Sequence, residues 1–200
     1  MIFSIMLGAI LCTAPTLNAQ PGQRTQFITD SLDSYIQSAM QAWNIPGVSV
    51  AIVRDGKPIV LRGYGVTELN GAQPVDEHTL FMVASNVKAF TGTAMAMLEH
   101  DKRCSLDDKV QKWLPQFTLS NPDLAARANL RDLLVHHLGY STFQGDFMYF
   151  YSDLKPDEIY TTYARIQPPF EYRSRYGYSN IGYFYAGECI SAISGMSWDA

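Results

Sequence analysis

The sequence predicts an α+β fold in which a short antiparallel sheet comes first and a series of helices follows. Two β-like runs at 48–53 and 58–64 flank the hairpin signal Asp55-Gly56, and the segments after residue 80 carry helical patterns. Strands followed by a run of helices are typical of α+β layers, because α/β folds alternate the two kinds of element. The 200 residues, of which 47% are hydrophobic and 17% charged, are enough for one sizeable core.

The helices are predicted from the spacing of apolar residues and from stop signals. A polar linker at 20–25 precedes a helical pattern over 27–43. Gly139 and Gly195 are placed to end two of the later helices. These later helices are expected at about 85–100, 106–113, 130–137, 157–166 and 181–194.

The N-terminal segment predicts a secretory signal peptide over residues 1–19. Residues 2–12 form an apolar run that is too short to span a bilayer, and the small Ala19 suits cleavage. No Lys or Arg precedes this run, and Leu17 is larger than the usual small residue, so an N-terminal helix of the mature fold is the alternative. The expected localisation is secreted or periplasmic, with no stable membrane span.

Charge and ligand patterns argue against two classes of function. The formal net charge is −4 and no basic stripe is present, so we do not expect nucleic-acid binding. His136 and His137 are adjacent and would face different ways on a helix, which makes a poor chelate. We therefore predict no metal and no cofactor. Cys104 and Cys189 are expected to be free structural thiols, with a disulfide between them as the alternative in an oxidising compartment.

A candidate nucleophile and base lie in the apolar segment 80–98. Lys88 is the only charged residue of this segment, and it follows Ser85 by three positions. A segment that is apolar on all sides is expected in a core, where a lysine is costly unless it is paired or loses its proton. On a helix that starts at Ser85, both side chains share a face, and the serine N–H is a free donor of the first turn. Such a pair suits a serine nucleophile with its base.

The Ser-x-x-Lys pattern alone is weak, because a chain of this size should contain it about once by chance. A second match occurs at Ser152 and Lys155, in a polar stretch followed by Pro156. We interpret that match as an exposed helix start with a surface serine and a solvated lysine.

A second candidate motif is Tyr178-Ser179-Asn180, the only Tyr-x-Asn in the chain. A tyrosine can shuttle a proton, and an asparagine amide can hold a substrate carbonyl or amide group. The structural alternative is a tyrosine packed under a turn and an asparagine that caps the next helix.

In chain order these motifs resemble those of the serine β-lactamase and penicillin-binding-protein-like hydrolases. The resemblance is to the class C β-lactamase, DD-carboxypeptidase and esterase branch in particular. Leu138 departs from the serine that is usual in its turn. The matching segments are two opening strands at 45–53 and 62–66, a nucleophile box at 79–88, a helix and turn at 130–139, and a second box at 176–183.

The resemblance implies a role for each candidate residue. Ser85 is the acylated nucleophile, Lys88 activates it, Tyr178 shuttles a proton to the leaving group, and Asn180 contacts the substrate. Whether Lys88 or Tyr178 is the base stays open. The implied fold is an antiparallel sheet flanked by helices, with a helical region at roughly 100–177. The implied substrate is a small molecule or peptide, namely a D-alanyl peptide, a β-lactam or an ester.

The third box of this family, a Lys/His-x-Gly triplet, does not follow Asn180. Residues 20–200 are therefore expected to be an incomplete catalytic domain without its C-terminal strands, which leaves an exposed sheet edge and an uncovered apolar face. We expect this chain alone to be poorly stable and inactive, and its full-length parent to be an active hydrolase.

Two further hypotheses remain open. One is a non-catalytic protein on the same fold that binds a peptidoglycan-type ligand. The other is an unrelated secreted binding module in which Ser85 and Lys88 are only core residues. The aromatic loop at 143–151 either lines a pocket for an apolar acyl or aryl group or simply packs against the helical region. The sequence indicates no oligomeric state.

Overall fold

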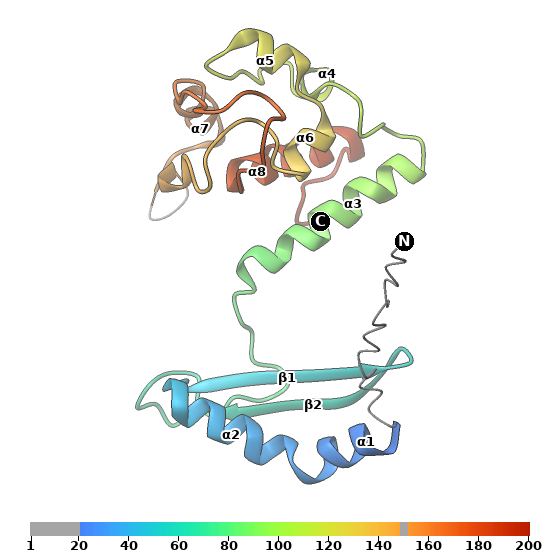
Figure 1. Cartoon of the computed structure of the whole chain (residues 1–200), viewed down its shortest axis with the longest axis vertical. Coiled ribbons are helices and arrows are strands. Elements are labelled where there is room, and N and C mark those ends of the chain that lie inside the picture. Colours follow the sequence, from blue (N-terminus) through green and yellow to red (C-terminus); the bar gives the residue numbers. More distant parts are fainter. Residues whose placement is uncertain (1–20, 149–151) are drawn as a thin grey trace, which may run out of the picture. The chain divides into compact units, whose positions relative to one another are not determined.

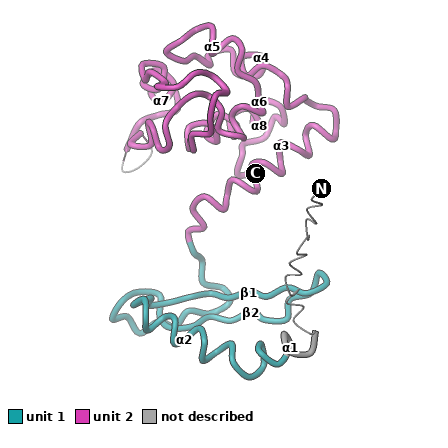
Figure 2. The backbone as a smooth tube through the Cα atoms, viewed as in Figure 1, with its two compact units in different colours: residues 1–81 teal, residues 82–200 magenta. Residues whose placement is uncertain are grey.

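The computed structural model describes residues 21–148 and 152–200, which divide into two compact units after Phe81 (Figure 2). The predicted signal peptide lies outside the described residues. Within the described part, no helix has the length and apolar character needed to cross a membrane. The elements are α1 (Pro21–Asp30), α2 (Leu32–Trp43), β1 (Gly47–Arg54), β2 (Lys57–Gly65), η1 (Ala84–Asn86), α3 (Val87–His100), α4 (Val110–Trp113), α5 (Pro122–Arg127), α6 (Leu130–Leu134), η2 (Asp146–Met148), α7 (Pro156–Tyr163) and α8 (Asn180–Ser194).

The first unit contains the predicted hairpin. β1 and β2 pair antiparallel from Gly47 opposite Gly65 to Arg54 opposite Lys57. Asp55 and Gly56 both have positive φ, 51° and 73°, as the tight turns that match the twist of a hairpin require. The prediction of two strands joined at Asp55-Gly56 is confirmed.

The prediction for the segment before the hairpin is wrong in two respects. Residues 20–25 were expected to be a linker, but α1 already begins at Pro21, and proline suits the first helical position because its φ is preset. The helix expected over 27–43 is broken at Ser31, and α2 ends at Asn44 in a left-handed conformation. Asp33 ties α2 to β2 by accepting hydrogen bonds from Arg62 and Tyr64.

The second unit is built around α8, which lies among α3, α4 and α6 (Figure 1). Seven residues of α8 are buried, and Ala192 is its one exposed residue, as expected of a helix that neighbours pack around. Ser179 caps its N-terminus by accepting a hydrogen bond from Gly182 N–H at 3.2 Å, and Gly195 ends it with φ 75°.

Cys189 is buried in α8 as a free thiol, and Cys104 is also free. The interpretation of both cysteines as unpaired is confirmed.

The expectation that segment 80–98 is buried all round is met on one side only. Thr91, Met95 and Leu98 of α3 are buried, but Met82 is 99% and Phe90 is 69% exposed. The exposed side of α3 borders a groove of about 590 Å³ with a mainly apolar lining. Large apolar side chains of the second unit are therefore left in contact with solvent.

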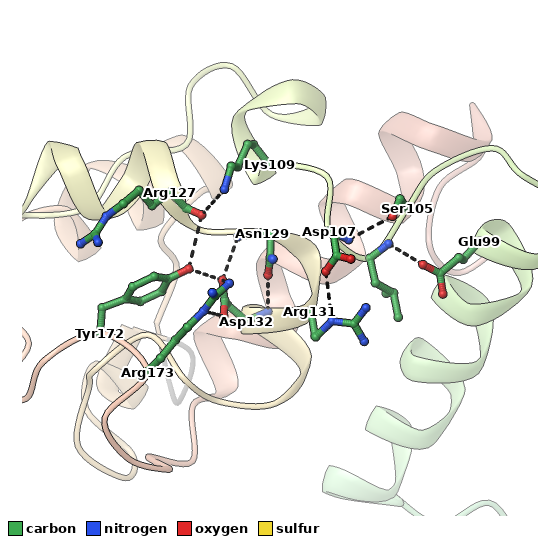
Figure 3. A network of polar contacts seen from close by, with 11 residues as sticks. Glu99, Ser105, Asp107, Lys109, Arg127, Asn129, Arg131, Asp132, Tyr172 and Arg173 are labelled. Carbon is green, nitrogen blue, oxygen red and sulfur yellow. Dashed lines mark hydrogen bonds and ion pairs between the residues drawn. The ribbon is translucent and has the colours of Figure 1, made fainter.

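A buried carboxylate joins α6 to the segment that leads to Tyr178 (Figure 3). Asp132 is 2% exposed and accepts hydrogen bonds from Arg173 Nε at 2.7 Å and from the Tyr172 hydroxyl. Asp132 and Asn129 also form a reciprocal capping box at the start of α6. Burial alone would raise the pKa of Asp132, but the hydrogen bonds from Arg173, Tyr172 and the Asn129 backbone outweigh it and lower the pKa.

Candidate active site

The site begins at the entry to α3. Ser85 lies in the 3₁₀ turn η1, and Lys88 is the second residue of α3. The predicted start of the α-helix at Ser85 is therefore two residues early, because a tight turn comes first. Ala84 has φ 44°, a left-handed conformation that a residue with a Cβ rarely adopts. This local backbone geometry places Ser85 on the surface of the second unit, with Lys88 half-buried behind it.

Ser85 Oγ accepts two hydrogen bonds from side chains. Lys88 Nζ donates at 3.1 Å, and Tyr178 OH donates at 2.6 Å. Tyr178 is 93 residues away in the sequence, so the second contact depends on the packing of the whole unit. The three predicted catalytic residues lie together in one hydrogen-bonded group.

Asn180 belongs to the same group. Lys88 Nζ donates a hydrogen bond to Asn180 Oδ1 at 2.6 Å, and Asn180 Nδ2 donates to Asp146 Oδ2 at 2.6 Å. The capping role that was the alternative for Asn180 is filled by Ser179 instead. The side chain of Asn180 thus bridges a cation and a carboxylate.

Tyr178 is held by aromatic neighbours. The His136 ring stacks on it with 4.7 Å between centroids, and the Phe143 ring meets it edge-on at 5.4 Å. Lys88 Nζ lies 4.8 Å from the centre of the tyrosine ring. Partial burial opposes ionisation, but the interactions with Lys88 and Ser85 outweigh it and lower the pKa of Tyr178. The site therefore favours the phenolate more than water does.

His136 is a residue of the site that sequence reasoning missed. Its Nδ1 accepts a hydrogen bond from the backbone N–H of Ser179 at 3.0 Å, and it packs between Tyr176, Tyr178 and Tyr183. Burial lowers the pKa of His136, and the charge of Lys88 adds to this effect. A neutral ring with an unprotonated Nδ1 is the form that can accept this hydrogen bond, so His136 fixes the backbone that carries Tyr178.

The surroundings of the site are open and mainly apolar. A hollow of about 320 Å³ lies beside Lys88 and Asn180, with Thr91, Tyr183 and Trp198 in its lining. Within residues 21–148 and 152–200, no group of three His, Cys, Asp or Glu residues could hold a metal ion.

Comparisons with known proteins define the family. A family model for beta-lactamases matches residues 32–200. Protein flp of Staphylococcus aureus is 32% identical over 108 residues, which are 54% of this chain and 22% of that protein. The unguisins hydrolase ungD of Aspergillus violaceofuscus is 24% identical over 188 residues, 90% of this chain and 33% of that protein. A solved class C beta-lactamase superposes with a TM-score of 0.71 at 26% identity, over 86% of this chain and 45% of that one.

The chain belongs to the beta-lactamase family, because the family model covers most of its length. The predicted resemblance and the predicted fold, which is that of the serine hydrolases of this family, are both confirmed. The chain spans less than half the length of each of these three relatives.

Proposed function

We propose that the complete protein to which this chain belongs is a serine hydrolase that forms an acyl-enzyme on Ser85. The observation that carries the proposal is the pair of hydrogen bonds that Ser85 Oγ accepts from Lys88 and Tyr178. A hydroxyl between two groups that exchange protons suits nucleophilic attack, because one group can take its proton while the other balances charge. Membership of the beta-lactamase family supports the same chemistry.

In the proposed reaction, Ser85 Oγ attacks the substrate carbonyl carbon and gives its proton to a deprotonated Tyr178 or Lys88. The tetrahedral intermediate collapses as the bond to the leaving group breaks, and the proton passes to that group. Water then attacks the ester on Ser85, the acid is released and the Ser85 hydroxyl is restored. The N–H groups of the first helical turn have no partner within the helix, so we assign the Ser85 N–H to the oxyanion.

Tyr178 is the better candidate for the base. Its pKa is lowered against the opposing effect of burial, and its hydroxyl is 2.6 Å from Ser85 Oγ. In this assignment Lys88 donates hydrogen bonds to Ser85 and Asn180 and stabilises the phenolate. Asn180 contacts the substrate with its side-chain amide.

The proposed substrates are D-alanyl peptides, β-lactams and esters, which share the acyl-enzyme step. Phe143 packs against Tyr178 and is largely exposed, as is Phe147. An apolar surface beside the nucleophile favours substrates with an apolar acyl or aryl group, since their burial is favourable. One relative is named as a hydrolase of unguisins, which supports hydrolysis as the type of reaction.

Turnover by the complete protein tests this function. We expect hydrolysis of at least one of three probes: a D-alanyl-D-alanine peptide, a chromogenic β-lactam and a nitrophenyl ester. If folded protein hydrolyses none of them but binds peptidoglycan fragments, the alternative of a non-catalytic binding protein is correct.

We also propose that the 200-residue chain by itself is poorly stable and inactive. The support is the exposure of large apolar side chains, among them Leu80, Met82 and Phe90. Expression of this chain alone, followed by thermal melting and the same three assays, tests the proposal. Turnover as fast as that of the complete protein would contradict it.

Secretion to the outside or the periplasm is proposed from the apolar segment before Ala19. N-terminal sequencing of the mature protein tests this: cleavage after Ala19 supports it, and an intact Met1 on intracellular protein contradicts it.

A further inference from the structure

We propose that Asp146 is a positioning residue that fixes the side-chain amide of Asn180, so that Asn180 Oδ1 faces Lys88. This inference rests on the proposed serine hydrolase function. It adds a side chain to the group formed by Ser85, Lys88, Tyr178 and Asn180. The links run from Ser85 to Lys88 at 3.1 Å, from Lys88 to Asn180 at 2.6 Å and from Asn180 to Asp146 at 2.6 Å.

The hydrogen-bonding chemistry of Lys88, Asn180 and Asp146 allows only one orientation of the amide. A lysine ammonium can only donate hydrogen bonds, and an ionised carboxylate can only accept them. Asn180 lies between these two, so its oxygen must face Lys88 and its NH₂ group must face Asp146. If the amide turned over, its oxygen would face a carboxylate oxygen and its NH₂ group would face an ammonium. Asp146 and Lys88 therefore act together to remove the rotational ambiguity that an asparagine side chain otherwise has.

The place of Asp146 in the fold makes it a firm support. It is the first residue of η2, whose Met148 is 1% exposed and anchors the turn in the core. Its backbone N–H donates to Phe143 O at 3.1 Å, and Phe143 in turn packs on Tyr178. The turn that carries Asp146 is thus packed against the catalytic tyrosine.

The other oxygen of the Asp146 carboxylate is Oδ1. This atom is buried and, among the described residues, has no hydrogen-bond partner. A carboxylate oxygen is costly to bury without a partner, so the favourable interaction of Asp146 is concentrated on Oδ2 and Asn180. Its charge also acts on the site, because it raises the pKa of Tyr178, which the nearby Lys88 lowers.

The inference is tested by the rate at which a fluorophosphonate labels Ser85 in the complete protein. Intact mass spectrometry at successive times measures this rate. Asp146→Ala leaves Lys88 alone to orient the Asn180 amide, and we expect labelling to slow by about 10- to 100-fold. Asp146→Asn keeps the shape but can present either an oxygen or an NH₂ group, so we expect a smaller loss. The exposed Asp153→Ala is the matched control, and we expect its rate to stay within about 2-fold of wild type.

The pH profile provides a readout that a purely structural role would not move. Tyr178 faces Lys88, Asp146 and the neutral His136 ring. Removing the negative charge in Asp146→Asn makes the phenolate easier to form, so the acid limb of the labelling rate should move to lower pH. A double-mutant cycle tests whether Asp146 acts through Asn180. If it does, Asp146→Ala should slow the labelling of an Asn180→Ala protein by less than about 2-fold.

The outcomes separate the inference from the function on which it rests. Folded wild-type protein that is not labelled would overturn both. Labelled wild type, with an unchanged rate in folded Asp146→Ala, would overturn the inference alone. If Asp146→Ala does not fold, the isosteric Asp146→Asn decides: an unshifted acid limb and a wild-type rate would overturn it. If Asp146→Ala slows labelling of the Asn180→Ala protein as much as it slows labelling of wild type, the inference would also be overturned, since Asp146 would then act by another route.

Discussion

The chain contains two Ser-x-x-Lys motifs, and their surroundings differ. Ser85 and Lys88 are hydrogen-bonded to each other, and both also contact side chains of the segment at 178–180. Ser152 Oγ instead accepts a hydrogen bond from the backbone N–H of Leu154 at 3.2 Å. Lys155 is exposed and directly precedes α7. The interpretation of the second motif as an exposed helix start is confirmed.

The Ser-x-x-Lys spacing by itself only brings a serine and a lysine onto one face of a helical turn. At Ser85 the two side chains are on a turn and helix that pack against α8, so Tyr178 and Asn180 approach from the opposite side. At Ser152 the serine satisfies a local backbone donor, as serines before helices often do. The proposed chemistry requires partners from a distant segment, and among the described residues the first motif has them and the second does not.

Replacing each serine by alanine should give the largest difference between the two motifs. We expect Ser85→Ala to abolish acylation, because the nucleophile is lost, and Ser152→Ala to keep a rate within about 2-fold of wild type. Hydrolysis of a nitrophenyl ester by the complete protein measures both. Near-normal turnover by Ser85→Ala would refute the assignment of the nucleophile.

The two lysines give the next largest contrast. Lys88→Ala should slow acylation by several orders of magnitude, since Ser85 and Asn180 both lose their cationic donor. Lys155→Ala should have almost no effect. Single-turnover labelling of Ser85 compares them, and equal rates in the two variants would contradict the role of Lys88.

Tyr178→Phe tests the partner that reaches Ser85 from a distant segment, because it removes only the hydroxyl that donates to Ser85. We expect a loss of about 10²- to 10⁴-fold in acylation rate. In the wild type the rate should rise with pH through the lowered pKa of Tyr178, where the phenolate forms. The phenylalanine protein should lack this rise, and a Phe variant that keeps the same acid limb would exclude Tyr178 as the base.

Asp132→Ala tests the scaffold that supports one motif and not the other. Loss of a buried, hydrogen-bonded carboxylate should lower the free energy of unfolding by about 3 kcal/mol. Asp107→Ala, in the same region (Figure 3), removes a partner of an exposed ion pair with Arg131 and should cost under about 0.5 kcal/mol. Urea denaturation of the complete protein measures both changes, and equal costs would contradict the argument.

The stability difference should also depend on pH. The pKa of Asp132 is lowered from 3.8 in the folded state. Its contribution is therefore present above about pH 4 and is lost as the pH falls through the folded pKa. The gap between wild type and Asp132→Ala should narrow in acid, and a gap that widens there would show that the sign is wrong.

Local chemistry explains which elements could be predicted from the sequence. Asp55-Gly56 specifies a tight turn by its positive φ values, and Gly195 specifies the end of α8. The helix α5 was missed although its signal was present. Asn121 accepts hydrogen bonds from two N–H groups of the first turn, and Pro122 occupies the first helical position.

The candidate site was only partly predictable, for a different reason. Ser85 and Lys88 are linked by spacing along one turn, which a sequence can show. Their contacts with Tyr178 and Asn180 were expected from a family resemblance, since spacing alone does not relate positions so far apart. His136 and Asp146 had no signal at all, because a stacked ring and a buried carboxylate acquire their roles only when α3, α6 and α8 pack together.

The most direct test of the central claim is intact mass and peptide mapping after the complete protein reacts with a fluorescent penicillin or a fluorophosphonate. We predict a single adduct on Ser85 and none on Ser152, because Ser85 is hydrogen-bonded to Lys88 and Tyr178, whereas among the described residues Ser152 is hydrogen-bonded to the backbone N–H of Leu154. An adduct on Ser152, or no adduct on protein that is shown to be folded, would contradict the claim.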